Sequence, residues 1–394
     1  MKGLYKYLPP FAPDYSGVCS VLFNLNGIVI IHDASGCTGN FTGYDEPRWY
    51  GSNAAIFSSG LREIEAVLGD DERLINRIME AVERMPRNFV ALLGSPAPAV
   101  IGVDMQALAR ILKARSGLPV LSFDTTGIKY YDTGASQAYL EIARNFVKPW
   151  NGKKQALVNI LGAIPLDMGK GKRVRDIGLL LRQCGFSKVY AWGQNAGLKE
   201  ISQAGAASLN LVVAYSGLAV ARYLHEHFAT PYMVGIPIGQ GSTNQFMRTA
   251  SSVLGLETQP RTTPYLLPPN TYAQALVIGE QVMAGSIRSF LRLDWGIRKV
   301  DVASFFAMDK ELWEEGDKFL EEEDDLSSLC QRENYDLIIG DPLYENLLGA
   351  NQGRFIHFPH VAVSSRLYWD NEPACVGKQL EGLSSELKTP ARRT

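Results

Sequence analysis

Short runs of β-branched and other apolar residues recur along the chain, and most are bounded by glycine, proline or aspartate. Runs of this kind are typical of strands that are buried on both faces of a parallel sheet. They predict strands at residues 27–33, 88–93, 118–123, 156–161, 188–192, 209–214, 300–306 and 336–339. Residues 61–85, 101–115 and 218–228 carry apolar positions three and four apart, which predicts amphipathic helices between the strands. The alternation predicts an α/β fold with mostly parallel sheets.

Two segments rich in proline and polar residues divide this pattern. They are residues 148–154 (KPWNGKK) and residues 257–270 (ETQPRTTPYLLPPN). A chain of 394 residues has room for several domains of ordinary size. We therefore expect an N-terminal α/β domain at residues 1–150, a second at 151–258 and a third at 259–394.

Composition narrows the possible partners. The chain has 39 Lys+Arg and 41 Asp+Glu, a formal charge of −2 and a hydrophobic content of 46%. This composition excludes a disordered chain, and the near-zero charge gives no field that would favour nucleic acid or anionic lipid. No uninterrupted apolar run is long enough for a membrane span, and the first residues lack a signal-peptide pattern. We expect a cytoplasmic protein that binds neither nucleic acid nor membrane.

Two of the five cysteines stand beside glycine. Cys19 and Cys37 each lie within two residues of a glycine, and Cys37 follows the strand predicted at 27–33. Open α/β sheets place ligands at the carboxyl ends of strands, where small neighbours let a bulky group approach the backbone. Free cysteine is also a common core residue, so spacing alone leaves both roles open. The other cysteines are Cys184, which we expect in the core, and Cys330 and Cys375, which receive no role.

Eight segments, taken in order, resemble the component 1 superfamily of nitrogenase. That family includes dinitrogenase subunits, cofactor-assembly scaffolds, and dark-operative protochlorophyllide and Ni-tetrapyrrole reductases. The matching segments are 13–19 (PDYSGVC), 32–37 (HDASGC), 58–68 (SSGLREIEAVL), 100–109 (VIGVDMQALA), 119–127 (PVLSFDTTG), 207–213 (ASLNLVV), 230–239 (TPYMVGIPIG) and 335–340 (YDLIIG). The resemblance implies three Rossmann-like domains with mostly parallel sheets around a central cleft.

The resemblance also implies an iron–sulfur cluster at a subunit interface, with Cys19 and Cys37 as metal ligands. The family's third cysteine is missing, because residues 94–98 read GSPAP. A [4Fe–4S] cluster generally needs four ligands, and twofold pairing of identical chains brings two from each. We therefore expect a homodimer with one bridging [4Fe–4S] cluster. A heterodimer with a related chain that supplies the missing thiolates is the alternative.

Three residues near these cysteines have two interpretations each. Asp33 is a stand-in cluster ligand or a helix cap, and Ser95 is a weak ligand or a turn residue. His32 is a donor to a cluster sulfur or a hydrogen-bonded residue at the end of a strand. Dinitrogenase holds its catalytic metal cluster through a second-domain cysteine, but the matching residues 212–217 read VVAYSG. A molybdenum cluster held in that way is not expected.

The implied cleft has candidate lining residues in the second and third domains. They are Tyr215, Ser216, Gly239 and Thr243 as substrate contacts, with His357 and His360 from the segment FIHFPHV. The two histidines could bind a metal together if this segment were helical, but the phenylalanine and proline residues beside them favour an extended chain. We expect Asp33, His357 and His360 to act as proton sources.

These expectations predict a nitrogenase component 1-like oxidoreductase that reduces an unsaturated small molecule, such as a tetrapyrrole. Electrons would come from a separate ATP-dependent iron–sulfur reductase that binds over the dimer axis. Residues 167–173 (DMGKGKR) lack the spacing of a phosphate-binding loop, so this chain is not expected to hydrolyse ATP. The alternatives are a scaffold that carries a metal cluster without turnover and a cluster-free binding protein of the same fold.

Overall fold

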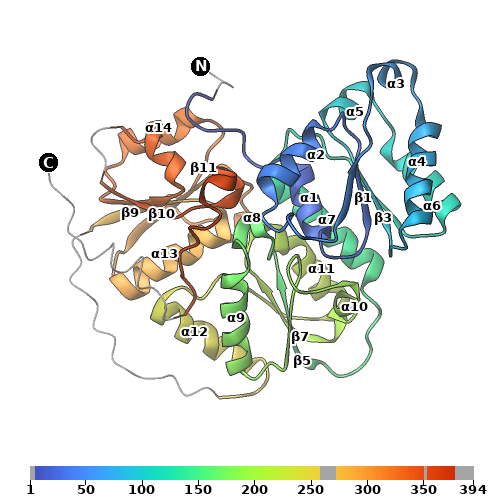
Figure 1. The fold of residues 1–394 in the computed structure, drawn as a ribbon. Helices are drawn as coiled ribbons and strands as arrows, with labels where there is room; N and C mark the ends of the chain where they lie inside the picture. Colours follow the sequence, from blue (N-terminus) through green and yellow to red (C-terminus); the bar gives the residue numbers. More distant parts are fainter. Residues whose placement is uncertain (1–4, 258–271, 350–352, 378–394) are drawn as a thin grey trace.

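Three parallel sheets form the framework of the molecule (Figure 1). The computed structural model describes residues 5–257, 272–349 and 353–377. Every pair of neighbouring strands in these sheets runs parallel. The predicted α/β class with parallel sheets is therefore confirmed. We call each sheet with its covering helices a unit.

The first unit has the strand order β2-β1-β3-β4. Its strands are β1 (Ile28–Ile31), β2 (Ala55–Ser58), β3 (Val90–Leu93) and β4 (Val120–Phe123). Its helices are α1 (Asp14–Leu22), α2 (Gly36–Asn40), a π-helical turn (Phe41–Asp45), α3 (Glu63–Leu68), α4 (Asp71–Arg84), α5 (Pro96–Ile101), α6 (Met105–Ser116) and α7 (Tyr131–Phe146).

Alternate residues of each strand pack on opposite faces of the first sheet. Ile28 and Ile30 join a core that includes residues of α4 and α6. Val29 and Ile31 join a larger core that includes residues of α1 and α7. Because successive side chains of a strand point to opposite faces, a strand covered on both sides must be apolar throughout.

The second unit has the order β6-β5-β7-β8. Its strands are β5 (Gln155–Leu161), β6 (Lys188–Ala191), β7 (Ala207–Val212) and β8 (Tyr232–Val234). Its helices are α8 (Pro165–Met168), α9 (Lys172–Gln183), α10 (Leu198–Ile201), α11 (Leu218–Phe228) and α12 (Gly239–Ser252), with 3-10 turns η2 (Ala204–Ala206) and η3 (Tyr215–Gly217).

The third unit has the order β11-β10-β9-β12-β13. Its strands are β9 (Gln274–Ile278), β10 (Lys299–Ser304), β11 (Lys318–Phe319), β12 (Leu337–Gly340) and β13 (Arg354–His357). Its helices are α13 (Gln281–Trp295), α14 (Glu323–Arg332) and α15 (Val361–Ser364), with 3-10 turns η4 (Lys310–Leu312), η5 (Pro342–Leu347) and η6 (Ser365–Tyr368).

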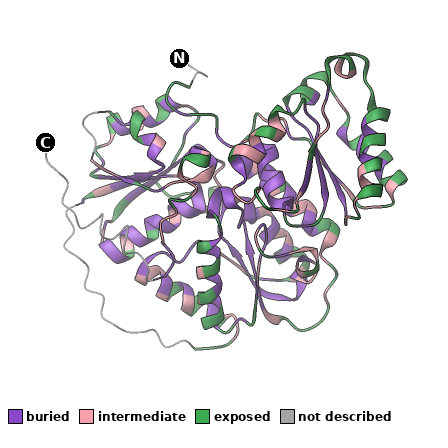
Figure 2. Ribbon diagram, viewed as in Figure 1, coloured by how far each residue is buried: buried purple, intermediate pink, exposed green. Residues whose placement is uncertain are grey.

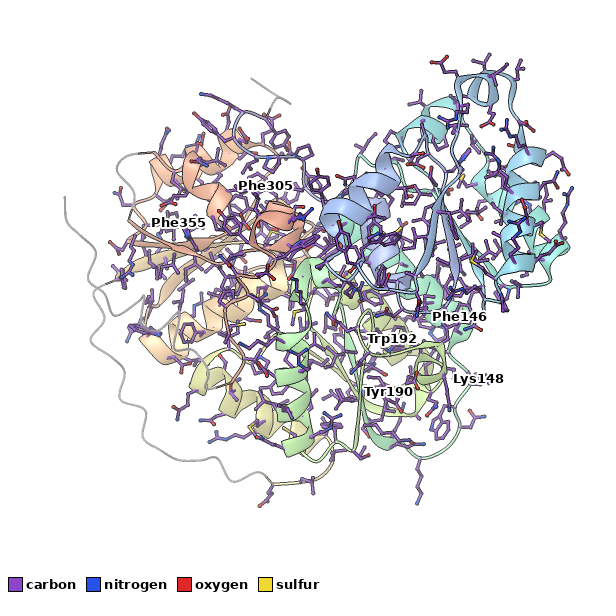
Figure 3. The ribbon with its side chains drawn as sticks, viewed as in Figure 1. Phe146, Lys148, Tyr190, Trp192, Phe305 and Phe355 are labelled. Atoms are coloured by element: carbon purple, nitrogen blue, oxygen red, sulfur yellow. The ribbon has the colours of Figure 1, made fainter. Side chains whose placement is uncertain are left out.

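Helix α7 links the first unit to the second. The Phe146 ring at its end lies 5.6 Å from the Phe89 ring, and the Lys148 amide donates to the Ser202 carbonyl at 3.1 Å (Figure 3). The Tyr139 hydroxyl donates to the Trp192 carbonyl at 2.9 Å. Buried residues gather on the strands and where the units meet, whereas the outer helices expose one face (Figure 2). The junction of the units is thus part of the core.

Each strand predicted from the sequence is present, and 218–228 forms a helix as expected. The helix predicted at 61–85 is two helices, because Gly69 has a φ of 71°. The helix predicted at 101–115 is likewise interrupted at Gly102, where φ is 75°. β2, β8, β9, β11 and β13 were not among the predicted strands. No helix in the described part of the chain is both long and apolar enough to cross a membrane.

The three sheets lie at 28–123, 155–234 and 274–357, within the three predicted domains. The domain boundaries themselves stay a prediction. The boundary at 258/259 lies outside the described residues.

Candidate functional site

Segments from all three units meet at the centre of the molecule, where Figure 1 shows the short helix α8 between α7, α11 and α13. Tyr131 begins α7 of the first unit, and Asp167 lies in α8, after β5 of the second. Glu280 directly follows the loop at the end of β9, and His360 follows β13. Open α/β sheets bind ligands beyond the carboxyl ends of their strands. We call this place the junction.

Three side chains, one from each unit, make direct polar contacts at the junction. The Tyr131 hydroxyl donates a short hydrogen bond to Asp167 Oδ1 and lies 3.2 Å from His360 Nε2. His360 Nε2 lies 3.4 Å from Asp167 Oδ1. The Tyr131 and His360 rings meet edge to face at 5.9 Å. These contacts join a phenol, a carboxyl group and an imidazole in one buried group.

Further carboxyl groups surround this triad. Glu280 caps α13, and its carboxyl also accepts the Tyr215 amide at 2.7 Å. Asp132 accepts the Ala307 amide at 2.7 Å, so it joins the first unit to the third. Asp341 accepts the His360 amide at 2.8 Å. Backbone donors therefore hold these carboxyls in place.

Burial strongly shifts the pKa values of the ionisable side chains at the junction. The pKa of Asp167 is raised to about 8, mainly by burial. The hydrogen bond from Tyr131 lowers this pKa, and the nearby Asp132 carboxylate raises it. Burial also raises the pKa of Glu280 to about 7, and the charge of Asp167 adds to this. It lowers the pKa of His360 to about 4, although nearby carboxylates oppose the shift. Desolvation disfavours every charged form, so neutral acids and a neutral imidazole coexist near pH 7.

A cavity of about 20 Å³ lies among Asp167, Arg173, Glu280 and His360. This volume suits a single water molecule. Asp167 Oδ2 and His360 Nδ1 have no hydrogen-bond partner within the described residues. Arg173 is 4% exposed, and its guanidinium lies 4.9 Å from the Phe358 ring. The junction is therefore polar and nearly closed, and a larger ligand enters only when side chains or units move apart.

The structure places the predicted cleft residues in different surroundings. Tyr215 and Ser216 form η3 beside the junction, and the buried Ser216 hydroxyl has no partner within the described residues. Thr243 donates its hydroxyl to the Gly239 carbonyl at the start of α12. A Cβ at Gly239 would lie 2.4 Å from the Phe290 ring, so this glycine is required for packing. A substrate-binding role for these four residues stays a prediction.

The two predicted histidines do not come together. His357 ends β13 and is exposed, with Nε2 2.9 Å from Glu345 Oε2. His360 turns into the junction instead. The expected extended chain is present over Arg354–His357, and His360 lies beyond its end, directly before α15. His360 thus lies where a proton donor or acceptor can act, whereas His357 is at the surface.

The predicted cysteines lie in the first unit. Cys37 is half-buried in α2 and has the Tyr15 and Ser95 hydroxyls as hydrogen-bond partners. Cys19 lies in α1 with an exposed fraction of 0%. Burial raises the pKa of both thiols, and nearby carboxylates raise the pKa of Cys19 further.

The residues between β1 and α2 form a tight turn. Asp33 accepts the Thr38 amide at 2.9 Å and the Ser58 hydroxyl at 2.5 Å, so it caps the start of α2. Ser35 has a φ of 91°, a strained conformation for a residue with a side chain. His32 Nδ1 lies 2.8 Å from the Ser59 hydroxyl. These contacts match the capping interpretation of Asp33, while its role as a proton source stays a prediction.

Comparisons with known proteins show which family has this architecture. A family model described as nitrogenase component 1 type oxidoreductase matches residues 14–357. The chain belongs to this family. The component 1-type chain also has the fold of the solved structure titled "Nitrogenase Cp1 at pH 6.5", with a TM-score of 0.73, 15% identity, and coverage of 99% of this chain and 93% of that one.

Curated relatives of the component 1-type chain carry several names. It is 26% identical to one of the subunits of light-independent protochlorophyllide reductase from Cereibacter sphaeroides, over 45% of this chain and 34% of that protein. It is 22% identical to the iron-molybdenum cofactor biosynthesis protein NifE of Methanosarcina barkeri, over 62% and 55%. It is 26% identical to the nitrogenase molybdenum-iron protein alpha chain of Crocosphaera subtropica, over 45% and 38%. The matches thus span about a third to about half the length of these relatives.

The first unit carries the two cysteines that were predicted as cluster ligands. In the described part of the chain, no three histidine, cysteine or carboxylate side chains converge to hold a metal ion. A Cβ at Gly36, Gly39 or Gly43 would meet nothing within 4 Å, so the face beside Cys37 is open to a bulky group or a partner. Cys37 fits the role of a cluster ligand as it stands. Cys19 fits it only after the side chains that cover it move.

Sequence reasoning missed most of the junction. Asp167 and Arg173 were considered only as the ends of a rejected phosphate loop, and Tyr131 and Glu280 were not considered. Glu280 follows a strand, which is a usable signal in an α/β chain. Tyr131 and Asp167 carry no such local signal, because their importance arises from the meeting of two units.

Proposed function

We propose that this chain is a subunit of a component 1-type reductase that reduces an unsaturated small molecule at the junction. The observation that supports it is the pair of buried carboxyls, Asp167 and Glu280, whose pKa values are raised to about 8 and about 7. Adding two electrons and two protons across an unsaturated bond requires proton donors. A carboxylic acid kept neutral near pH 7 by burial is suited to that task.

The residues of the junction divide this work. Asp167 and Glu280 hold protons, and the Tyr131 hydroxyl fixes Asp167 through its hydrogen bond. His360, neutral at pH 7, accepts or passes a proton through Nε2. The Ser216 hydroxyl has no hydrogen-bond partner within the described residues and is free to orient the substrate. The cavity holds one water molecule as it stands, so a small unsaturated substrate requires side chains to move, and a tetrapyrrole requires the units to separate.

The proposal includes a homodimer with a [4Fe–4S] cluster held by Cys19 and Cys37 of each chain. Such a cluster would supply one-electron transfer between the reductase and the junction. The open glycine face beside Cys37 supports close approach of a second copy. The exposed Tyr44 side chain, just beyond α2, adds apolar surface near this face.

We place the ATP-dependent iron–sulfur reductase on an apolar patch of the first unit. The patch consists of Ile64, Val67 and Leu68 on α3 with Val100 and Ile101 on α5. Val67 is 82% exposed and Val100 is 86% exposed. Val67, Leu68 and Ile101 line one hollow with His32, and His32 directly precedes the turn that leads to Cys37. Contiguous exposed apolar side chains rimmed by charge are typical of a protein interface.

The decisive experiment combines the anaerobically purified protein with a matching reductase, ATP and unsaturated test substrates. We expect substrate consumption that is reduced at least about a hundred-fold by Asp167→Asn. Asp301→Asn is the control, because Asp301 is a buried carboxyl that accepts the Tyr335 hydroxyl at 2.9 Å, away from the junction. An equal effect of both variants, or no consumption by the wild type with any substrate, would overturn the proposal.

A second candidate is a metal-cluster scaffold without turnover. The match to NifE, a protein named for iron-molybdenum cofactor biosynthesis, supports it. A scaffold releases a preloaded cluster to an apo-protein, and Asp167→Asn leaves that release unchanged. Transfer without substrate consumption would identify this function.

A further inference from the structure

A second, larger cavity lies between the second and third units, away from the buried triad. Its volume is about 440 Å³, within the range of small-molecule sites. One face of α12 and one face of α13 form two walls, and residues 311–314 form a third. Both cavities lie along α13, but their linings have no residue in common. Gln281, Val282, Gly285 and Ser286 face this cavity, whereas Glu280, Met283, Ala284 and Ile287 face the junction.

The helix faces that line this cavity are polar where a packed interface would be apolar. From α12 come Ser242, Gln245 and Thr249, and from α13 come Ser286 and Ser289. The Ser242 hydroxyl is enclosed and has no hydrogen-bond partner within the described residues. An enclosed hydroxyl without a partner is destabilising, and a water or ligand group that hydrogen-bonds to it removes this penalty. The walls therefore suit a ligand with hydrogen-bonding groups.

The cavity is held open by fixed contacts. The Gln281 side chain binds the backbone of Asp309 twice, at 2.6 Å and 3.0 Å, and so holds the segment that leads to residues 311–314. Ser286 accepts the Ile236 amide at 2.9 Å, which fixes the loop after β8 against α13. A cavity with braced walls on three sides does not need to form around its ligand.

The charged groups of this cavity are already paired. Arg288 contacts Asp317 at 2.6 Å and Glu314 at 3.1 Å, and a second arginine contacts Glu314 at 2.7 Å. Glu311 is paired with Arg222 at 2.7 Å. A charged ligand would have to break one of these pairs or remain unpaired. The cavity therefore favours a neutral ligand.

Aromatic and apolar side chains complete the lining. Trp313 is 41% exposed on the wall formed by residues 311–314, and Phe246 faces the cavity from α12. The exposed face of an indole ring is stabilised most when another flat, apolar surface stacks on it and removes it from water. We propose that this cavity binds a neutral molecule of about nucleoside size, with a planar ring and hydrogen-bonding groups.

The test uses the full chain and three probes in saturation-transfer NMR. Adenosine is neutral and planar, adenosine 5′-monophosphate adds negative charge, and methyl β-D-glucoside is neutral without a planar ring. We expect adenosine to bind and adenosine 5′-monophosphate to bind no more tightly than adenosine. The glucoside should give no signal. Absence of adenosine binding, or tighter binding of the charged probe at this cavity, would overturn the proposal.

Two substitutions locate the binding. Gly285→Leu fills the cavity, since the nearest neighbour of a Cβ there is the Arg288 guanidinium at 4.0 Å. We expect it to weaken adenosine binding at least about ten-fold, whereas Gly285→Ala, the matched control, retains binding. Trp313→Ala should weaken binding similarly, and Trp313→Phe less. Equal binding by the wild type, Gly285→Leu and Trp313→Ala contradicts this site, and circular dichroism confirms that each variant is folded.

Discussion

The Tyr131 hydroxyl of the first unit donates a hydrogen bond to the Asp167 carboxyl of the second. Both side chains are almost entirely buried. The bond therefore ties the junction together and sets the position of a proton donor. These two consequences can be separated, because stability responds to any lost buried hydrogen bond whereas turnover responds only to groups that act on substrate.

Tyr131→Phe removes this bond and leaves Asp167 without its donor. We expect the free energy of unfolding to fall by about 1–3 kcal/mol and the pH profile of turnover to shift. Tyr139→Phe is the matched control, because it removes a buried bond from the same helix to the Trp192 carbonyl. Denaturant unfolding and pH–rate profiles check both. If Tyr139→Phe shifts the pH profile as much as Tyr131→Phe, the assignment of Tyr131 is wrong.

The junction also predicts a pH dependence of stability. Asp167 has a pKa of about 8 in the folded chain, against about 4 for an aspartate in an unfolded chain. Because folding raises this pKa, the contribution of Asp167 to the free energy of unfolding is complete below pH 4 and is lost as the pH rises through 8. Asp167 therefore makes the free energy of unfolding decline between about pH 5 and pH 8, on the order of 1 kcal/mol per pH unit. Asp167→Asn should remove this part of the decline.

Chemical unfolding at several pH values measures this slope. Asp301→Asn is again the control for the loss of a buried carboxyl outside the junction. His360 acts in the opposite direction: its pKa is lowered to about 4, so its contribution is lost as the pH falls through 4. Parallel slopes for the wild type and Asp167→Asn between pH 5 and pH 8 would show that Asp167 is ionised in the folded chain.

The sequence was sufficient for eight of the thirteen described strands but not for the junction. Strands such as Val90–Leu93 are buried on both faces, so their apolar runs are visible without any tertiary information. Short or partly exposed strands such as β8 and β11 lack that signal. His360 was singled out through its partner His357, yet the structure separates the two.

The rest depends on contacts between distant parts of the chain. Tyr131 and Asp167 come from different units and become a pair only when α7 packs beside α8. Their pKa shifts arise from burial at that contact, which no local pattern encodes. Likewise, the family resemblance implied the ligand role of Cys19, and the glycine two residues before it has a packing role in the α1–α7 contact that its spacing did not indicate.

Close packing of α1 against α7 predicts an unusually sensitive glycine. A Cβ at Gly17 would lie 1.9 Å from the Tyr131 carbonyl oxygen, so alanine there must push the helices apart. We expect Gly17→Ala to lower the free energy of unfolding by at least about 2 kcal/mol. Gly285→Ala, also within a helix but without a close neighbour, should raise it by about 0.5–1 kcal/mol. Similar effects from both substitutions would contradict the close approach.

Iron analysis tests the proposed cluster. The anaerobically purified dimer should contain roughly four iron atoms per pair of chains, with matching acid-labile sulfide. Cys37→Ser and Cys19→Ser should each lose both. Cys184→Ser should retain them, because Cys184 is a buried cysteine at the end of α9, outside the proposed set. A wild-type dimer without iron, or iron retained in Cys37→Ser, excludes a cluster held by these thiols.

The apolar patch on α3 and α5 predicts a variant that affects only the reductase. Val67 is 82% exposed, so Val67→Glu should not disturb the core, but it places a charge in the centre of an apolar contact. We expect reductase-dependent turnover to fall at least about ten-fold, while iron content and turnover with a small chemical reductant stay unchanged. Leu179→Glu is the control, since Leu179 is 57% exposed on α9 of the second unit. Loss of turnover with both electron sources would show that Val67 supports the fold or the site, and normal reductase-dependent turnover would place the reductase elsewhere.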